Sequence, residues 1–502
     1  MEASPSSTPG LKRSLSVWAA VGLSVALMAP SMAANINPQG SALHAGRAVP
    51  LTFLIAAVGV LLVAYSFVRL CQYFHHAGSV YAFVGATLGP RTGVVAGWGL
   101  LGTYTFYAVV TSAAAGIFGT AFLQEVGIWH NPPTWAPFVL LAVALLLALW
   151  LAIIPARRGA TVLLSVEGTT VALILVVTAV VLVRLLAGNA PGGHTFTLSV
   201  FSVSPGTPIN EVFLGVVFGF LSFAGFEAAA TLGEEARRPT RDIPRAILGT
   251  AIFGGLYFVI VTAVEVMGFG AGPAGVKAFT NSQSLLGDLG SSYVGSWVGD
   301  VITLGTAISA FGCCLACVVG AARLVYALSR DTAGPRGLGL SSSRWGTPVW
   351  ATLAVVVSAG IIVIVESAVA AQADAFNSFL WSGTIGTLIL LVVYVLASVG
   401  CIMLVFVRHK LPVPMWQIIV PIAGLVVLGY TLYRNVWPWP AGSAGWIPSV
   451  AGIWLAVAVI VVIFAASTAR KLGAALAARE GIKAPGTEEP APRMAAARDE
   501  TA

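Results

Sequence analysis

The chain is built from long, unbroken runs of apolar residues that are separated by short polar segments. Runs such as 139–154 and 353–365 show no alternation of apolar and polar positions, which argues against the strands of a membrane barrel. Many runs reach the roughly 20 residues that a helix needs to cross a hydrocarbon core of about 30 Å. The pattern predicts an all-α polytopic membrane protein with twelve transmembrane helices, at residues 14–34, 49–70, 93–122, 135–154, 160–187, 211–233, 243–269, 294–328, 348–366, 375–406, 415–433 and 446–467.

Composition agrees with a membrane protein and excludes an ordinary water-soluble domain. Of the 502 residues, 58% are hydrophobic and 9% are charged, whereas soluble domains carry about 25% charged residues. The five cysteines lie in or beside apolar runs, where small buried side chains are expected rather than disulfide bonds. Cys314 and Cys317 form a C-x-x-C without a second pair or a neighbouring histidine, so no metal or cofactor is predicted.

The basic residues separate into two groups of loops. With twelve spans both ends share one side, and 22 of the 26 basic residues fall on that side. The other four are Arg47, Arg184, Lys277 and Arg434. Because cytoplasmic loops are rich in Lys and Arg, this split predicts that both termini are cytoplasmic, and it explains the net charge of +7 without a nucleic-acid partner. The 21 Arg against 5 Lys and the abundant Ala favour a bacterial plasma membrane.

The two ends of the chain are predicted to be cytoplasmic tails, at residues 1–13 and 468–502. The second is rich in Pro, Gly and Glu, which is typical of disorder. The N-terminus has a second interpretation, because basic residues 12–13, the apolar stretch 15–28 and the small residues 31–34 resemble a secretory signal with a cleavage site. Cleavage would leave eleven spans in the same orientation, so the charges do not separate the two interpretations.

Two spans contain helix-breaking residues where the membrane interior is expected. In the first span Pro30 follows a mostly apolar stretch, and in the sixth span Gly225 and Glu227 interrupt an apolar run. Freed backbone groups at that depth are tolerated only where they are buried in protein or line a cavity. Taken singly, Pro30 could be a kink and Gly225 a close-packing contact.

The two breaks together are more informative than either alone. Broken helices at matching positions of two halves are typical of transporters built from inverted repeats. The breaks match if five-helix repeats occupy residues 14–187 and 211–406, with two extra helices at 415–467. Unwound backbone at the breaks would offer half-helix N-terminal amides to an anion and free carbonyls to a cation, which suits a zwitterion such as an amino acid.

Three blocks of sequence stand out beyond the hydropathy pattern. Residues 218–247 read FGFLSFAGFEAAATLGEEARRPTRDIPRAI, residues 76–98 run from HAGSVY through LGP to AGW, and residues 322–331 read ARLVYALSRD before Thr347-Pro348. In this order and spacing they resemble the amino acid-polyamine-organocation (APC) superfamily of permeases. They match its sixth span and following loop, its loop after the second span and the end of its eighth span.

The resemblance implies alternating access, with substrate bound between the broken first and sixth spans. The sixth-span contacts would be Phe223, Ala224, Gly225 and Phe226, with backbone carbonyls meeting the substrate amine. In the first span the family's glycine-rich G-S-G-I-[FG] is replaced by Ala29, Pro30, Ser31, Met32 and Ala33. Proline removes one amide donor. An amine or another small metabolite therefore stays open as a substrate beside an amino acid.

Carboxylates within the membrane are the candidates for proton coupling, since an ionised Asp or Glu there costs at least about 2.5 kcal/mol. Glu227 lies beside the second break, and the matching glutamate of the family is associated with proton sensing or coupling. Glu167 lies in the fifth span, which the resemblance makes a wall of the cavity. Alternatively, Glu227 only pins the broken helix by hydrogen bonds. Asp300 and Glu265 are expected near outer helix ends, where they reach water.

Several other residues have both a functional and a structural interpretation. Thr306 and Ser309 in the eighth span could ligate Na⁺ or could be packing hydroxyls. Asp242 is expected to cap the seventh span with Pro244 in its first turn. Three aromatic residues could line or gate the cavity or could simply pack, namely Tyr104 and Tyr107 in the third span and Trp381 in the tenth.

These features predict a secondary transporter for an amino acid or related organic cation, coupled to H⁺, with exchange as the alternative. No enzyme is predicted, since H-E-x-x-H and G-x-x-x-x-G-K-[ST] are missing from the sequence. A non-transporting substrate sensor with the same fold stays open as well.

Overall fold

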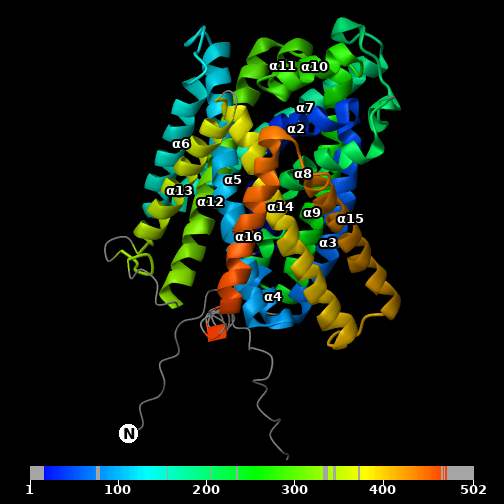
Figure 1. Cartoon of the computed structure of the whole chain (residues 1–502). Coiled ribbons are helices and arrows are strands. Elements are labelled where there is room, and N and C mark those ends of the chain that lie inside the picture. Colours follow the sequence, from blue (N-terminus) through cyan, green and yellow to red (C-terminus); the bar gives the residue numbers. More distant parts are fainter. Residues whose placement is uncertain are drawn as a thin grey trace, which may run out of the picture.

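The computed structural model describes residues 16–74, 80–154, 157–204, 206–232, 236–331, 337–342, 346–370, 373–464, 467 and 470–471. Every regular element in this part of the chain is helical (Figure 1), which confirms the predicted all-α class. The predicted tail at 1–13, most of the tail at 468–502 and the start of the family block at 76–79 lie outside the described residues.

The described residues form sixteen α-helices. They are α1 (Val17–Met28), α2 (Pro30–Ala45), α3 (Val49–Tyr73), α4 (Val80–Leu88), α5 (Pro90–Glu125), α6 (Ala136–Ile153), α7 (Arg157–Leu186), α8 (Val212–Phe223), α9 (Pro239–Phe269), α10 (Pro273–Asn281), α11 (Leu285–Tyr293), α12 (Ser296–Asp331), α13 (Val349–Val369), α14 (Ala375–Ile402), α15 (Ile419–Val436) and α16 (Trp446–Phe464). The shorter helical segments are the 3-10 helices η1 (Gly46–Ala48), η2 (Pro191–Gly193), η3 (Leu198–Phe201), η4 (Ile209–Glu211), η5 (Ala228–Leu232), η7 (Met415–Ile418) and η8 (Gly442–Gly445), and the π-helical segment η6 (Met403–Val407).

Eleven helical stretches of the described chain are long and apolar enough to cross a membrane. The first of them, Ala20–Tyr73, has 54 residues and covers α1 from Ala20 onward together with α2 and α3. This is more than twice the roughly 20 residues of one crossing. The predicted count of twelve spans therefore requires that this stretch crosses the membrane twice.

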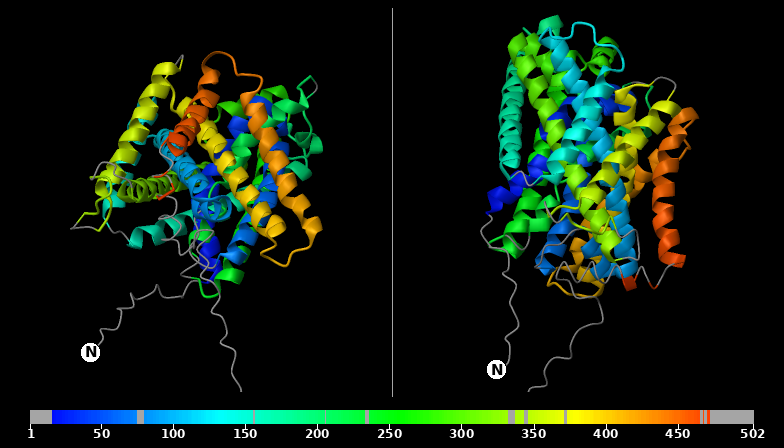
Figure 2. Two further views of the ribbon diagram at one scale, coloured as in Figure 1. Left: turned by 60° about the horizontal axis from the view of Figure 1, so that its bottom comes forward. Right: turned by 90° about the vertical axis from the view of Figure 1, so that its left-hand side faces the viewer.

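The long helices lie side by side, with short helices at the two ends of the bundle (Figures 1 and 2). At the core α5 packs against both α12 and α14, while α3 packs against α8 and α9. Short helices α10 and α11 lie at one end of the molecule and α4 lies at the other (Figure 1). The two broken spans are neighbours, because α2 packs directly against α8.

The first broken span is longer than predicted. Its expected end was residue 34, but α2 continues to Ala45. Hydropathy marks Asn35, Asn37 and Gln39 as a membrane boundary, yet their exposed fractions are 1%, 0% and 3%. These polar side chains are buried among other helices of the protein, and a hydropathy pattern does not distinguish protein from water around a polar residue.

The start of α9 also differs from the prediction. The helix begins at Pro239, so Asp242 lies within its first turn and is not the N-cap residue. The Asp242 carboxylate instead accepts a hydrogen bond from the backbone amide of Arg238 at 3.2 Å. A negative charge in the first turn still favours the helix, because it faces the positive end of the helix dipole.

Candidate functional site

The first break separates α1 from α2 at a single residue. Ala29 has φ 44° and ψ 59°, a left-handed conformation that non-glycine residues rarely adopt. Pro30 follows as the first residue of α2, where its missing N–H costs no helical hydrogen bond. The predicted interruption of the first span is therefore present, and it leaves the N-terminus of α2 in the protein interior.

A carboxylate of the protein occupies this helix N-terminus. The amide N of Ser31 donates to Oε1 of Glu167 in α7 at 2.9 Å, and the Glu167 side chain is 6% exposed. The free amides of the first turn, together with the helix dipole, favour a negative charge there. Glu167 thus lies at the place where the resemblance puts the substrate carboxylate.

Two hydroxyls lie close to the same carboxyl. Ser31 Oγ and Ser309 Oγ, the latter from α12, interact electrostatically with Glu167. Both oxygens are buried, and among the described residues neither has a partner in hydrogen-bonding geometry. The structure therefore brings the predicted residues Glu167, Ser31 and Ser309 together around the first break.

The second break lies opposite the first. Helix α8 ends at Phe223, Gly225 has φ 100°, and η5 resumes the helical path at Ala228. A Cβ atom on Gly225 would lie 3.0 Å from Cβ and 3.2 Å from the carbonyl carbon of Leu27 in α1. Glycine is required here by its φ and by this close approach. The two breaks are thus in direct contact.

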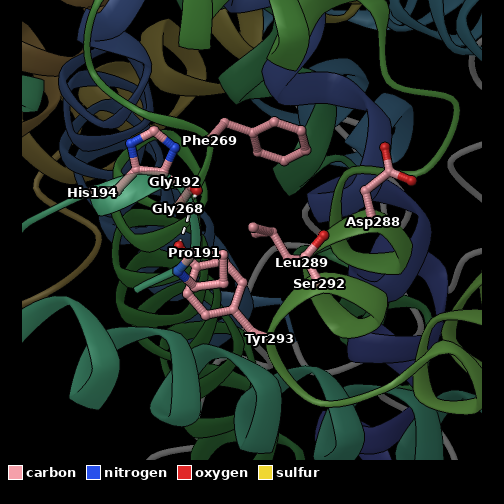
Figure 3. A pocket seen from close by; sticks show the side chains of 9 residues that line it. All are labelled: Pro191, Gly192, His194, Gly268, Phe269, Asp288, Leu289, Ser292 and Tyr293. Atoms are coloured by element: carbon pink, nitrogen blue, oxygen red, sulfur yellow. Dashed lines mark hydrogen bonds between the residues drawn. The ribbon is translucent and has the colours of Figure 1, made fainter. Parts of the chain in front are cut away.

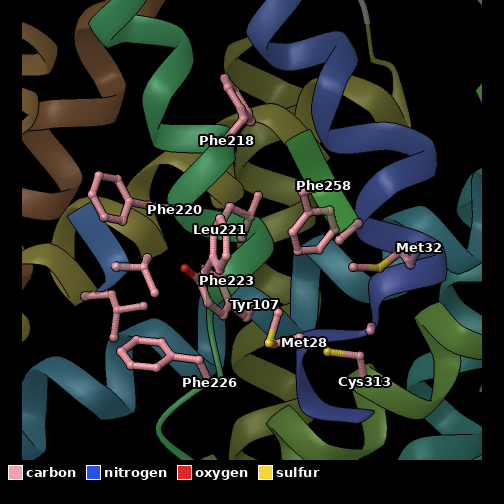
Figure 4. Close-up of a cluster of buried hydrophobic side chains, with 14 of the residues drawn as sticks. Met28, Met32, Tyr107, Phe218, Phe220, Leu221, Phe223, Phe226, Phe258 and Cys313 are labelled. Atoms are coloured by element: carbon pink, nitrogen blue, oxygen red, sulfur yellow. The ribbon is translucent and has the colours of Figure 1, made fainter. Parts of the chain in front are cut away.

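The aromatic side chains of the second break point into packed protein. The Phe223 and Phe258 rings lie 5.3 Å apart, and the Phe226 ring lies 5.7 Å from that of Tyr394. Figure 4 shows the Phe223, Phe226 and Phe258 rings in one buried cluster together with Met28 and Met32. What this segment can offer a substrate is its backbone, because the last carbonyls of α8 lie beyond the regular helical hydrogen-bond pattern. Two of them, at Leu221 and Phe223, accept from the amides of Ala224 and Phe226.

Glu227 is held at the end of the second break. The hydroxyl of Tyr394 in α14 donates to its Oε2 at 2.9 Å, and the side chain is 7% exposed. Two residues further on, within η5, the amide of Ala229 donates to Ser24 Oγ of α1 at 2.9 Å. Glu227 therefore connects the second break to α14, whereas Glu167 connects the first break to α7.

Asn35 joins three elements on the side of the breaks that carries α10 and α11. Its Nδ2 donates to Ser284 Oγ at 3.1 Å and to Thr306 Oγ1 at 3.0 Å, and its Oδ1 accepts from the Leu286 amide at 2.8 Å. Gln39 adds hydrogen bonds from Nε2 to the carbonyls of Phe279 and Ser282. This arrangement fastens α2 to α10, α11 and α12 and closes that side.

The remaining sequence candidates are distributed around the breaks. Tyr104 packs against Gly320 of α12, and the Tyr107 hydroxyl lies 3.0 Å from Thr387 Oγ1 in α14. Trp381 is half-buried in α14. The expectation that Glu265 reaches water is wrong. Its exposed fraction is 0%, and among the described residues neither carboxyl oxygen has a partner. Asp300, by contrast, is partly exposed.

Several residues at the site carried no signal in the sequence. The Tyr257 hydroxyl donates to the Pro30 carbonyl at 3.4 Å, and Tyr394 and Asn35 hold the contacts described above. Tyrosine and asparagine within apolar helices are compatible with many roles, so only the contacts identify these three. The acidic residue Glu366 in α13 could have been noted from its place in a predicted span, and it too was missed.

The described residues contain five free, buried cysteines and no cluster of three or more His, Cys, Asp or Glu side chains that could hold a metal ion. A cavity of about 210 Å³ lies away from both breaks (Figure 3). It is formed by η2, the end of α9 and α11, and Tyr293 closes one side by donating to the Gly268 carbonyl at 3.0 Å. None of its lining residues belongs to a break.

Two discontinuous helices in contact inside an all-helical membrane bundle are the mark of a secondary-transporter fold. The family model described as amino acid permease matches residues 38–473. The chain therefore belongs to the amino acid permease family, as the resemblance to the APC superfamily predicted. The match begins after the first break, so the part played by residues 29–33 is judged from the geometry.

Curated relatives agree with this family. The low-affinity putrescine importer PlaP of Escherichia coli (strain K12) is 26% identical over 341 residues, covering 67% of this chain and 72% of the relative. The branched-chain amino acid permease BcaP of Lactococcus lactis is 28% identical over 336 residues, covering 63% and 69%. Cationic amino acid transporter 4 of Mus musculus is 26% identical over 299 residues, covering 57% and 45%. These relatives are named as transporters and not as enzymes.

Proposed function

We propose that this protein is a secondary active transporter that moves an amino acid or a related organic cation across a bacterial plasma membrane by alternating access, coupled to H⁺. The observation that carries the proposal is the Glu167 carboxylate on the Ser31 amide. This contact supports the proposal because it puts a titratable group on the helix N-terminus where a substrate anion is proposed to bind. Membership of the amino acid permease family and the relatives' names support the substrate class.

The proposed orientation puts both termini in the cytoplasm and α10 and α11 outside. It rests on the 22 to 4 division of basic residues between the two groups of loops. The proposed repeats are residues 14–187 and 211–406, with 415–467 appended. The contact between Gly225 and Leu27 supports this division, because it pairs the break of span one with that of span six.

The substrate is proposed to bind between Ala29–Ala33 and Phe223–Phe226. An ammonium group would meet the backbone carbonyls at the end of α8, and a carboxylate group would meet the first amides of α2. Tyr104 lies on α5 near this space. In the conformation described here Glu167 holds the Ser31 amide, so a substrate carboxylate has to displace it.

This competition supplies a mechanism for proton coupling. Protonation of Glu167 removes the charge that favours its place at the helix N-terminus and frees the Ser31 amide for the substrate carboxylate. Release of the substrate on the other side lets Glu167 return, ionised, to the amide. Glu227 is proposed to respond to protons through its contact with Tyr394, and so to link the second break to α14.

A substrate without a carboxylate would use the site differently. An amine has no group that competes for the Ser31 amide, so Glu167 keeps its hydrogen bond to that amide. The amine then binds while both Glu167 and Glu227 keep their positions. The alternative transport mode is exchange of one substrate for another with no net movement of protons. One experiment decides both whether the substrate needs a carboxylate and whether transport is symport or exchange.

The test is uptake into proteoliposomes of matched pairs that differ only in a carboxylate, such as ornithine and putrescine or lysine and cadaverine. Each is measured with and without an imposed pH gradient, for wild type and Glu167→Gln. Gradient-driven accumulation that is lost in the variant supports coupling through Glu167. Counterflow that needs no gradient, without any gradient-driven accumulation in wild type, means exchange, and transport of no member of the panel contradicts the proposal.

A further inference from the structure

The first break separates the two halves of one helical hydrogen bond. In a continuous α-helix the Ser31 amide would donate to the Leu27 carbonyl, four residues earlier. Here that amide donates to Glu167 at 2.9 Å instead. The residue three positions after Leu27 is Pro30, which has no N–H to offer. The Leu27 carbonyl is therefore left without a donor from the helix that follows it.

A thiol takes the place of that donor. Cys313 Sγ of α12 donates to the Leu27 carbonyl oxygen at 3.5 Å, in a contact that is only partly buried. In Figure 4 the Cys313 side chain points from α12 toward the end of α1, beside Met28. A thiol is a weak donor and carries no charge. The two halves of the broken bond are thus capped unequally, the amide by a carboxylate and the carbonyl by a neutral thiol.

The Leu27 carbonyl lies where the two breaks meet. A Cβ atom on Gly225 would lie 3.4 Å from the Leu27 carbonyl oxygen. This carbonyl also belongs to the last turn of α1, where the helix dipole has its negative end. A carbonyl in that position favours a cation over a neutral donor.

Two unsatisfied hydroxyls lie around the same break. Ser309 is one turn before Cys313 on α12 and is 7% exposed, and Ser31 at the start of α2 is 0% exposed. Among the described residues neither Oγ atom has a partner in hydrogen-bonding geometry. Buried polar groups are normally paired, so these two hydroxyls indicate that a polar ligand completes the site.

We propose that the Leu27 carbonyl binds the ammonium group of the substrate, and that Cys313 is a positioning residue whose thiol holds this carbonyl until the ammonium group displaces it. This inference rests on the proposed transport function and adds the cation half of the first break to it. An ammonium group has a charge and three N–H donors, so it satisfies the carbonyl better than a thiol does. An amine then displaces Cys313 alone, whereas an amino acid displaces both Cys313 and Glu167.

The experiment measures the KM and the maximal rate of uptake into proteoliposomes for wild type, Cys313→Ser and Cys313→Ala. A hydroxyl is a stronger donor than a thiol, so Cys313→Ser is expected to raise KM roughly twofold to tenfold. Cys313→Ala removes the donor and is expected to lower KM about twofold. Putrescine and ornithine both carry an ammonium group, so their KM values are expected to change together.

Cys314, the next residue of α12, provides the matched control. Its Sγ donates to the Ala108 carbonyl of α5 at 3.8 Å, which belongs to neither break. Cys314→Ser and Cys314→Ala are therefore expected to leave KM unchanged. Equal KM changes in the Cys314 variants, or unchanged KM in both Cys313 variants, would overturn the inference while active transport still supports the proposed function.

Infrared spectroscopy tests the inference without transport. The S–H stretching band of Cys313 is isolated as the difference between wild type and Cys313→Ala in detergent. Addition of putrescine is expected to shift this band to higher frequency, because the thiol loses its acceptor. A band that neither putrescine nor ornithine moves would overturn the inference. A shifted band in a protein that transports no member of the panel would support the inference and contradict the transport proposal alone.

Discussion

The backbone amide of Ser31 and the carboxylate of Glu167 lie 2.9 Å apart, although 136 residues separate them in the sequence. This hydrogen bond joins the first break to α7 and fills an anion site with a group of the protein itself. Glu227 makes the corresponding contact at the second break, where it accepts from Tyr394 at 2.9 Å. Each discontinuous span is therefore tied to a continuous helix through a carboxyl group.

Substitutions of Glu227 separate its structural role from its role in transport. Glu227→Gln keeps an acceptor for the Tyr394 hydroxyl, so thermal stability in detergent is expected to stay close to wild type while gradient-driven uptake falls. Glu227→Ala leaves that buried hydroxyl without a partner, which costs about 1–3 kcal/mol. Wild-type uptake by a stable Glu227→Gln protein would show that the carboxyl only pins the break.

The positive φ at each break leads to opposite expectations for two small substitutions. Gly225→Ala places a Cβ 3.0 Å from that of Leu27 at φ 100°, and is expected to destabilise the protein by about 1–3 kcal/mol. Ala29→Gly relieves a left-handed alanine at φ 44° and is expected to be neutral or stabilising. Thermal unfolding of both variants checks this, and a stable Gly225→Ala protein would mean that the breaks are not in contact.

Asn35 is expected to control opening on the side of α10 and α11. Asn35→Ala removes hydrogen bonds to Ser284, Thr306 and Leu286, so amide exchange in the α11 peptide should become at least about tenfold faster. Hydrogen–deuterium exchange with mass spectrometry measures this. The matched control is Asn281→Ala at the exposed end of α10. Unchanged amide exchange of the α11 peptide in Asn35→Ala would show that Asn35 does not hold α11 closed.

Asp288, outside the membrane spans, gives a pH dependence with a defined sign. Burial raises its pKa above the ordinary value, and the hydrogen bond from Ser282 Oγ at 2.6 Å opposes this shift. Because the folded protein then holds the proton more tightly than the unfolded chain, stability falls as the pH rises through the folded pKa. Asp288→Asn is expected to flatten this decline in thermal unfolding as the pH rises above the ordinary Asp pKa of about 3.9. An identical decline in the variant would contradict the assignment.

The all-helical class, the family and the positions of the breaks could be predicted from the sequence. Long apolar runs fix the class, and Pro30 and Gly225 are rare enough within such runs to mark the breaks. The extension of α2 past residue 34 could not be predicted, because Asn35, Asn37 and Gln39 are polar residues that other helices bury. Hydropathy measures transfer from water and carries no information about a protein interior.

The hydrogen-bond partners of the carboxyl groups could not be predicted from the sequence either. Glu227 and Glu167 could be selected because each is an acid in an apolar run, but Tyr394 and the Ser31 amide are identified only by distance. Glu265 was expected in water and is completely buried, since its place near a helix end does not reveal which face of α9 it occupies. Spacing along one helix does not determine the neighbours that other helices supply.

The most direct test of the central claim is the proton movement that accompanies substrate entry. A pH-sensitive dye is enclosed in proteoliposomes, an amino acid substrate identified by the uptake panel is added outside, and wild type is compared with Glu167→Gln. Proton coupling through Glu167 predicts that the lumen acidifies with wild type but not with the variant, although the variant still exchanges substrate. Substrate entry through wild type without acidification, or acidification that persists in Glu167→Gln, would contradict the account.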